Sequence, residues 1–176
     1  MTEDKLEVYK NLLRVYSPVT DLVSARLLAE FEPRVKAAVE YGLFIPAGQR
    51  VLDVGSGAGL PGVPLAIFRP DLEVVLSEVR TRRLAFLELV VARLALPNLS
   101  LAPGDVRHGR GSFGFFTAQA VGSFAEVYRL IHPRAWPESV LISARKELGE
   151  LPKGAVRVRS SVIGEARIVA VTVVSD

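Results

Sequence analysis

The sequence contains no cysteine and only two histidines, His108 and His132. Disulfide bonds and thiolate-bound metals are therefore excluded, and a zinc site built on two histidines would need carboxylates to complete it. Charge of either sign is not in large excess, because 22 basic and 19 acidic residues leave a net charge of +3. We expect no metal centre, and this weak basic bias permits contact with a polyanion without requiring it.

Long apolar runs are also missing. No segment approaches the roughly 20 consecutive apolar residues that a membrane-spanning helix needs. The first ten residues, MTEDKLEVYK, lack the apolar stretch of a signal peptide. We therefore expect no membrane association and a cytoplasmic location. The chain does have 176 residues, of which 49% are hydrophobic, and this is enough for one packed domain over residues 1–176.

A helical N-terminal extension, residues 1–45, is predicted ahead of the main body of that domain. Apolar residues recur at helical spacing over residues 3–16 and again over residues 23–41. The breaker Ser17-Pro18 is expected to separate these two helices. Pro33 is expected to kink or split the second helix, because proline removes a backbone hydrogen bond.

Strand patterns alternate with helical patterns over the main body, residues 50–176. The predicted strands cover residues 50–54, 72–79, 99–103, 112–120, 140–144, 155–162 and 166–174, and the predicted helices cover residues 61–68, 80–95 and 123–131. The last two strands, separated by Gly164, are expected to form an antiparallel pair. Strands that alternate with helices predict an α/β fold with a doubly wound, mainly parallel sheet.

The most informative stretch is VLDVGSGAGLPG, in which glycine recurs at positions 55, 57, 59 and 62. In doubly wound sheets, ligands bind where the first strand turns into its helix, and glycine lets the backbone approach a ligand closely. A turn of this kind can also serve only to join strand to helix. Glu78, however, ends the next predicted strand about 20 residues after Gly55, where a carboxylate can accept hydrogen bonds from ribose hydroxyls. Asp105 follows the third strand. The pattern predicts a nucleoside-containing ligand.

The spacing of the glycines distinguishes between such ligands. The dinucleotide fingerprint requires a glycine at position 60, where this chain has Leu60. Asp53 adds a negative charge just before the first glycine, which would repel a pyrophosphate but attract a sulfonium or ammonium group. No lysine is followed by Ser or Thr, so a Walker phosphate loop is absent. S-adenosylmethionine is therefore favoured over NAD.

These residues resemble the 16S ribosomal RNA guanine-N7 methyltransferases, also called glucose-inhibited division protein B. The similarity is strongest over residues 50–100, above all in GAGLPGVPLAI followed by RPDLE. The resemblance implies the Rossmann-like fold of class I methyltransferases, S-adenosylmethionine as cofactor, and a guanine of 16S ribosomal RNA, free or in the small ribosomal subunit, as substrate. Carried over by position, it assigns cofactor binding to Asp53, Gly55, Ser56, Gly57, Gly59, Glu78 and Asp105.

Beyond residue 110 the chain departs from the family pattern. The segment FGFFTAQAV has Gly114 and Gln119 where the family has an aspartate and an arginine, and Ile168 stands where a histidine usually follows. Two alternatives to an active ribosomal RNA methyltransferase therefore stay open. One is a non-catalytic relative that binds the cofactor or RNA, and the other is a methyltransferase with a substrate other than RNA.

Candidate RNA contacts surround the expected site. Arg82 and Arg83 follow the second strand, and arginine is well suited to phosphate, although a solvated helical turn explains them equally well. By resemblance, Gln119, Lys146 and Arg167 are further candidates. Guanine N7 is already a nucleophile, so positioning and electrostatic support are expected to suffice, and no catalytic base is assigned.

Overall fold

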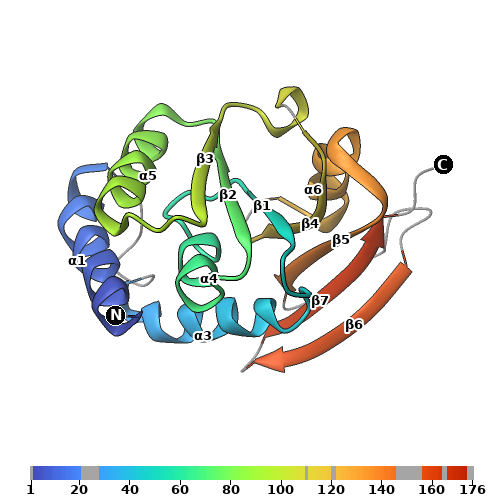
Figure 1. The fold of residues 1–176 in the computed structure, drawn as a ribbon, viewed down its shortest axis with the longest axis horizontal. Helices are drawn as coiled ribbons and strands as arrows, with labels where there is room; N and C mark the ends of the chain where they lie inside the picture. Colours follow the sequence, from blue (N-terminus) through green and yellow to red (C-terminus); the bar gives the residue numbers. More distant parts are fainter. Residues whose placement is uncertain are drawn as a thin grey trace.

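The computed structural model describes residues 2–20, 28–109, 111–119, 122–145, 156–163 and 166–173. The described strands are β1 (Arg50–Val54), β2 (Glu73–Glu78), β3 (Leu99–Pro103), β4 (Phe113–Ala118), β5 (Ala135–Arg145), β6 (Val156–Ile163) and β7 (Ala166–Val173). The described helices are α1 (Thr2–Thr20), α3 (Phe31–Gly42), α4 (Gly62–Phe68), α5 (Thr81–Leu94) and α6 (Phe124–Ile131), with short 3-10 turns η1 (Val106–His108) and η2 (His132–Arg134). Figure 1 shows their arrangement in one sheet with helices around it.

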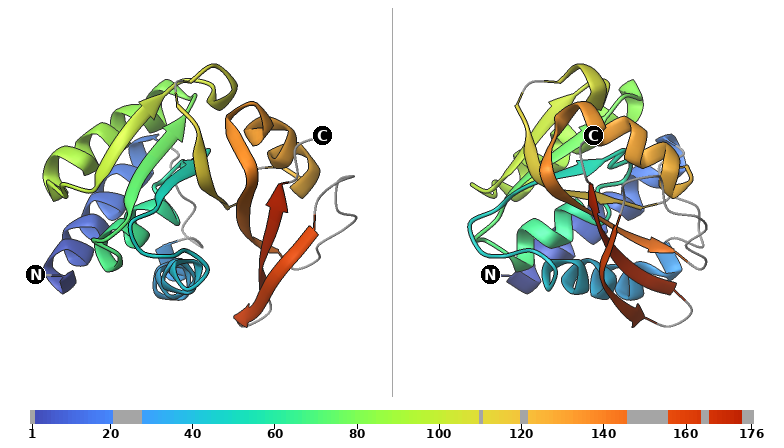
Figure 2. Two further views of the ribbon diagram at one scale, coloured as in Figure 1. Left: turned by 45° about the vertical axis from the view of Figure 1, so that its right-hand side comes forward. Right: turned by 90° about the vertical axis from the view of Figure 1, so that its right-hand side faces the viewer.

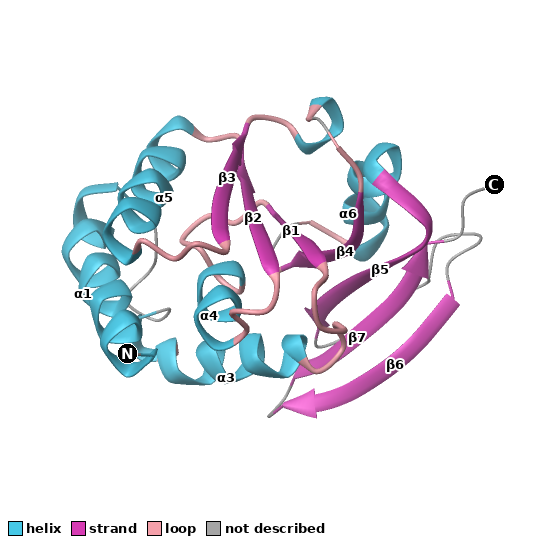
Figure 3. Ribbon diagram, in the orientation of Figure 1, coloured by secondary structure: helices cyan, strands magenta, loops and turns pink. Residues whose placement is uncertain are grey.

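The strands form one sheet in the order β3-β2-β1-β4-β5-β7-β6 (Figure 3). β1 pairs in parallel with β2 on one side and with β4 on the other, and β7 is antiparallel to both β5 and β6. The predicted α/β fold, a mainly parallel sheet with a C-terminal antiparallel pair, is confirmed. Strand order reverses between β1 and β4, and ligands of such sheets bind at that point, beyond the carboxyl ends of the strands.

Helices lie on both faces of the sheet (Figure 2), and apolar side chains form a core beneath each helical layer. On one face α1, α3, α4 and α5 pack together and bury residues such as Tyr9 and Leu87. On the opposite face α6 packs against the sheet and buries Val127 and Phe116. Because both faces are covered, β2 is buried at every position after its first residue. Its centre, Val74, Val75 and Leu76, is apolar on both faces of the sheet, whereas the buried residues that end it, Ser77 and Glu78, are polar.

The helical part of the chain differs from the prediction at its prolines. α1 continues through Ser17-Pro18 to Thr20, so the predicted break there is wrong. The proline falls in the last turn of the helix, where few backbone bonds remain to be lost. Pro33 lies in the first turn of α3, where its missing N–H has no helical partner, and the chain turns instead at Glu30. Residues 23–27 of the predicted second helix lie outside the described residues. Within the described ranges, no helix is both long and apolar enough to cross a membrane.

Among the strands, β5 departs most from its predicted bounds, since it was expected only over residues 140–144. Its first residues are irregular: the register against β4 shifts between Phe113 and Phe115, and Glu138 has a φ of 68°. Such an irregularity interrupts the alternation of buried and exposed side chains. The early part of β5 therefore carries no strand pattern that a sequence reading could detect.

Candidate functional site

The segment over residues 55–61, which we call the glycine loop, joins the end of β1 to the start of α4. Gly59 has a φ of +94°, and a Cβ at this position would lie 2.7 Å from Cγ2 of Val63 and 3.2 Å from Oη of Tyr9. A Cβ on Gly62 would lie 2.8 Å from the Oδ2 atom of Asp53. Glycine is therefore required at position 59 by conformation and space, and at position 62 by space alone.

Asp53 lies beneath this loop with its side chain fully buried. Its Oδ1 atom accepts a hydrogen bond of 2.8 Å from Oγ1 of Thr117 on β4, whereas Oδ2 has no hydrogen-bond partner in the described part of the chain. Burial raises the pKa of Asp53 to about 6, and the hydrogen bond from Thr117 partly opposes that rise. A nearby cation would offset the cost of burying this carboxylate.

Ser56 stabilises the loop through its hydroxyl and its backbone N–H. Its hydroxyl donates to the carbonyl oxygen of Asp53 at 2.9 Å and accepts from the N–H of Ser77 at 3.1 Å. The backbone N–H of Ser56 donates to the carbonyl oxygen of Ser77 at 2.9 Å. These bonds tie the end of β1 to the end of β2, and the assignment of Ser56 to cofactor binding remains a prediction.

Glu78 is the last residue of β2 and is buried. Its Oε1 atom accepts hydrogen bonds from the backbone N–H groups of Val79 and Arg80, at 2.8 and 2.9 Å. Its Oε2 atom accepts one from the N–H of Gly57 at 3.0 Å. A carboxylate offers about four acceptor positions, so these bonds orient Glu78 and still leave capacity for a hydroxyl donor.

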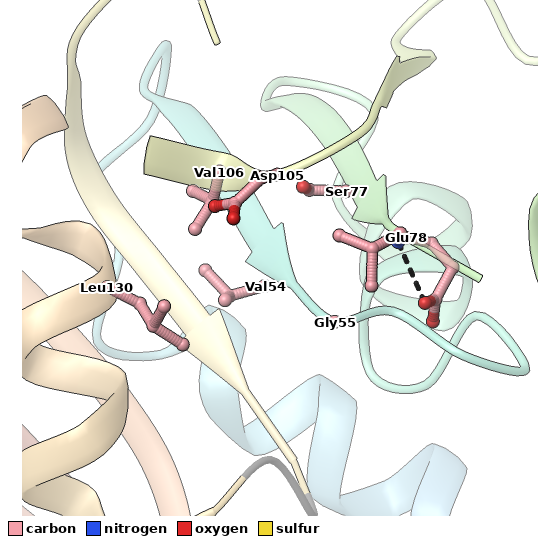
Figure 4. A pocket seen from close by; sticks show the side chains of 8 residues that line it. Val54, Gly55, Ser77, Glu78, Asp105, Val106 and Leu130 are labelled. Atoms are coloured by element: carbon pink, nitrogen blue, oxygen red, sulfur yellow. Dashed lines mark hydrogen bonds between the residues drawn. The ribbon is translucent and has the colours of Figure 1, made fainter. Parts of the chain in front are cut away.

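A cavity of about 210 Å³ opens beside Glu78 and the start of the glycine loop. Its lining residues are Val54, Gly55, Ser77, Glu78, Val79, Asp105, Val106 and Leu130. Figure 4 shows Val54, Val106 and Leu130 grouped together, with Glu78 apart from them near Gly55. The cavity thus has an apolar part and a carboxylate on a separate side, a combination that suits a flat apolar base joined to a hydroxyl-bearing sugar.

Asp105 lies at the start of η1 and is paired with Arg107. Nε of Arg107 lies 3.0 Å from each carboxylate oxygen of Asp105, and the backbone N–H of Arg107 donates to Oδ1 at 2.9 Å. These bonds and the arginine charge lower the pKa of Asp105 to about 2. Asp105 is therefore ionised at neutral pH and held in place at the cavity.

The two candidate arginines after β2 occupy different environments. Arg82 is exposed, whereas Arg83 is only partly exposed. The Nη1 atom of Arg83 lies 3.5 Å from the point that a Cβ on Gly57 would occupy. Arg83 therefore lies beside the glycine loop, and Arg82 belongs to the surrounding surface.

The remaining RNA candidates are only partly described. Gln119 directly follows β4, and Lys146 lies outside the described residues. The backbone of Arg167 pairs with that of Arg145 at the end of β5, which places it at the same edge of the sheet as the glycine loop. The side chain of Arg167 is not among those described.

Two of the three departures from the family pattern lie away from the cavity. Gly114 is near the start of β4, and a Cβ there would make ordinary contacts with Trp136 and Gln49, at 3.6 and 3.7 Å. Ile168 is fully buried and belongs to the core beneath α3 and α4. Gln119 directly follows β4 at the carboxyl edge of the sheet, and Ile168 pairs with Ala144 near the same edge but is buried in the core.

The structure adds residues that the sequence analysis did not single out. Oη of Tyr9 donates a hydrogen bond of 2.8 Å to the carbonyl oxygen of Ala58 in the glycine loop. Burial, together with the charge of Asp53, raises the pKa of Tyr9. In the sequence Tyr9 looks like one more residue of an apolar helix face. Thr117 is a polar residue within an apolar strand, and this alone weakly indicates a role for it at the site.

A protein-family model described as GidB, rRNA small subunit methyltransferase G, matches residues 2–169. Ribosomal RNA small subunit methyltransferase G of Acidothermus cellulolyticus is 42% identical over 101 residues, which are 57% of this chain and 46% of that protein. The protein of the same name from Helicobacter pylori strain HPAG1 is 36% identical over 96 residues, which are 54% of each chain. The chain thus matches about half the length of these curated relatives.

Solved structures of lower identity share the fold. A mutant of MtNAS in complex with S-adenosylmethionine superposes with a TM-score of 0.67 at 19% identity, covering 97% of this chain and 72% of that one. TrmN from Thermus thermophilus gives a TM-score of 0.58 at 19% identity, covering 78% of this chain and 47% of that one. The similarity to these structures shows a shared fold, a mainly parallel α/β sheet with helices on both faces.

Proposed function

We propose that this chain, which belongs to the GidB family of rRNA small subunit methyltransferases G, transfers a methyl group from S-adenosylmethionine to a guanine N7 of 16S ribosomal RNA. The observation that carries the proposal is the cavity beside the glycine loop, in which Glu78 and Asp105 lie at the ends of neighbouring parallel strands. A substrate of this kind places the protein in the cytoplasm with the small ribosomal subunit as its partner.

The residues around the cavity fit S-adenosylmethionine. The residues that would hold it are Asp53, Gly55, Gly57, Gly59, Glu78 and Asp105, with Ser56 stiffening the loop. Glu78 has acceptor capacity for a ribose hydroxyl, and the apolar side chains of Val54, Val106 and Leu130 suit the adenine ring. The buried Oδ2 atom of Asp53, without a partner in the described chain, is a negative group close to the loop that suits a cationic ligand.

The proposed reaction requires the protein mainly to position the methyl donor and the guanine. When bound, S-adenosylmethionine would supply a methyl group activated by a positively charged sulfur. Guanine N7 has the lone pair that would form the new N–CH3 bond as the S–CH3 bond breaks and S-adenosylhomocysteine leaves. No general base is needed, so the described residues have to hold the two reactants in line and exclude competing water. The absence of an assigned catalytic base is consistent with this reaction.

The positions of the family departures favour an active enzyme over a degenerate relative. Gly114 lies at the far end of β4, and Ile168 fills the core. Neither change touches the cavity. The replacement of arginine by Gln119 lies at the carboxyl edge of the sheet, and it is therefore the change that we expect to affect substrate binding.

Calorimetric titration with S-adenosylmethionine tests cofactor binding. Glu78→Gln keeps the size of the side chain but loses its charge, and a charge-assisted hydrogen bond is worth enough to weaken binding by about 10- to 100-fold. Glu73→Gln is the matched control, because Glu73 begins the same strand at its opposite end and is paired with Arg50. Equal affinity in the wild type and Glu78→Gln would remove Glu78 from the site.

Methyl transfer is then measured on 16S ribosomal RNA and small subunits from cells that lack the modification. Labelled 7-methylguanosine in the RNA is the expected product. Cofactor binding without transfer to RNA would favour a non-catalytic relative or a different substrate. No cofactor binding at all would mean that the glycine loop only joins strand to helix.

A further inference from the structure

The loop between β3 and β4 forms one wall of the cavity. Asp105 and Val106 of this loop are among the residues that line it (Figure 4). The loop contains η1, a single short turn, and glycines at positions 104, 109 and 111. Glycine restrains the backbone less than any other residue. We therefore expect contacts from outside the loop to fix where Asp105 and Val106 lie.

Arg134 contacts this loop from the end of η2. Its side chain is buried, with 4% of the residue exposed. Its Nε atom donates a hydrogen bond of 2.9 Å to the carbonyl oxygen of Gly111, and Nη1 makes a longer contact of 3.5 Å with the carbonyl oxygen of Val106. A Cβ added to Gly109 would lie 2.1 Å from Nη1, so the loop backbone packs directly against the guanidinium. One side chain thus touches the loop at three points between Val106 and Gly111.

The guanidinium of Arg134 is held in turn by an aromatic ring. Its central carbon lies 4.9 Å from the centroid of the ring of Phe113, a buried residue at the start of β4. A planar guanidinium can stack on a ring and donate in several directions at once, which the ammonium group of lysine cannot do. Burial and the charge of Arg50 lower the pKa of Arg134, so this is an unfavourable place for a positive charge. The contacts with Phe113 and with the loop offset that cost.

We propose that Arg134 is a positioning residue for the cofactor, which holds Asp105 and Val106 in place along the cavity. This inference rests on the proposed function, because it concerns the adenine side of the same site. The lining of the cavity does not include Arg134, so the residue acts through the loop. Without Arg134, the carbonyl oxygens of Val106 and Gly111 would lose a donor, and the wall beside the adenine ring would be free to move.

Calorimetric titration with S-adenosylmethionine tests the role of Arg134. Arg134→Lys keeps the charge but cannot make both loop contacts and stack on Phe113, and the Kd is expected to rise by about 10-fold. Arg69→Lys is the matched control, because Nη1 of Arg69 also donates to two backbone carbonyl oxygens, those of Gly42 and Ile45, at the opposite edge of the sheet. The control is expected to lose stability but to keep its Kd within about twofold of wild type. Equal affinity in the wild type and Arg134→Lys, or an equal loss in Arg134→Lys and Arg69→Lys, would overturn the proposal.

Gly109→Ala tests the same contact without replacing Arg134. Gly109 has a φ of −69°, which alanine adopts without strain, so the substitution acts through its clash with Nη1 of Arg134. We expect it to weaken cofactor binding by about 3- to 10-fold, and by less than about twofold in an Arg134→Ala background, where the clash is removed. Gly114→Ala is the control for a glycine replacement, since a Cβ there makes ordinary contacts. A penalty from Gly109→Ala that persists in the Arg134→Ala background would overturn the proposal.

A part of the cofactor separates positioning from a loss of folded protein. 5′-Methylthioadenosine carries the adenine and ribose without the amino acid group, and Arg134→Lys is expected to weaken its binding by the same factor as that of S-adenosylmethionine. At saturating cofactor, kcat on 16S ribosomal RNA is expected to stay within about twofold of wild type while KM for the cofactor rises. A lower kcat with an unchanged KM would indicate loss of folded protein and would count against a positioning role.

The behaviour of the wild type distinguishes this proposal from the proposed function. Wild-type protein that binds S-adenosylmethionine but methylates no RNA would contradict the proposed function alone, because the binding comparisons still decide the role of Arg134. Wild-type protein that binds neither S-adenosylmethionine nor 5′-methylthioadenosine would overturn both.

Discussion

At the scale of single residues, burial and charge compete most directly at Asp53. The side chain is fully enclosed, one oxygen is bonded to Thr117, and the pKa is raised to about 6. A carboxyl group in this state is costly to the fold when ionised, and a cationic ligand nearby would reduce that cost. The same residue therefore opposes folding and favours cofactor binding at neutral pH.

This opposition gives a pH-dependent prediction for Asp53→Asn. Because the pKa is raised from 3.8 to about 6 on folding, the folded state binds the proton more tightly, and the contribution of Asp53 to stability is lost as the pH rises through that range. The asparagine variant is expected to gain stability relative to wild type between pH 4 and pH 7, by a difference of about 2 kcal/mol. Urea unfolding at pH 4, 5, 6 and 7 measures this difference.

The cofactor affinity of Asp53→Asn is expected to change in the opposite direction. Calorimetry at pH 7 should show weaker binding of S-adenosylmethionine to a protein that is more stable when unliganded. A stability difference that does not change with pH would contradict the assignment of the raised pKa to Asp53.

At the scale of elements, α1 is tied to the glycine loop by one buried contact. Tyr9 packs its ring against Phe31 of α3, with ring centroids 5.8 Å apart, and its hydroxyl bonds to Ala58. The loop therefore takes its shape from a helix far away in sequence as well as from β1 and α4. A helix outside the sheet thus helps to shape the loop where we propose that the cofactor binds.

Tyr9→Phe isolates the hydroxyl from the ring. The substitution keeps the packing but leaves the buried carbonyl of Ala58 without its donor, and we expect a loss of about 1 to 2 kcal/mol in unfolding free energy. Cofactor affinity should fall with it, because the loop is less well held. Tyr16→Phe, on the same helix at a position that is 37% exposed, is the control and is expected to change both quantities less. Thermal unfolding and calorimetry provide the two measurements.

The elements also show what sequence reasoning can and cannot supply. β1 and β2 are buried at every position after the first, whereas the edge strand β3 is only partly buried. The apolar residues of these strands predict the strands themselves, and the site residues at their ends remain a prediction. The prolines of α1 and α3 misled, because the effect of a proline depends on its position in a helix, which periodicity alone does not define. Tyr9 and Leu130 reach the site only through tertiary packing, and a single sequence contains no signal for such contacts.

At the scale of the whole molecule, the weak net charge of +3 gives no strong field for RNA. The proposed binding of RNA would therefore depend on where basic side chains lie. Arg82 and Arg83 begin α5, close to the carboxyl end of β2, and Arg83 lies beside the glycine loop. This places two positive charges at the edge of the sheet that holds the cavity.

Neutralising both arginines tests their role in RNA binding. Arg82→Gln with Arg83→Gln is expected to weaken binding of 16S ribosomal RNA and to reduce the salt dependence of the affinity, by a slope of about 1 for each lost phosphate contact. Lys36→Gln with Arg93→Gln removes the same charge from exposed positions on α3 and α5 and is the control. Filter binding over a range of salt concentrations gives the slopes. Identical slopes in the two double variants would remove Arg82 and Arg83 from the interface.

Gly57 lies between the residue proposed to bind the cofactor sugar and one proposed to bind RNA. Its N–H donates a hydrogen bond to Glu78, and the guanidinium of Arg83 lies next to it. A sugar hydroxyl bound to Glu78 and a phosphate bound to Arg83 would each change the interactions of the same peptide group, that of Gly57. The two ligands are therefore expected to bind with a mutual free energy of coupling. By thermodynamic reciprocity, the factor by which RNA changes the affinity for the methyl donor must equal the factor by which the donor changes the affinity for RNA.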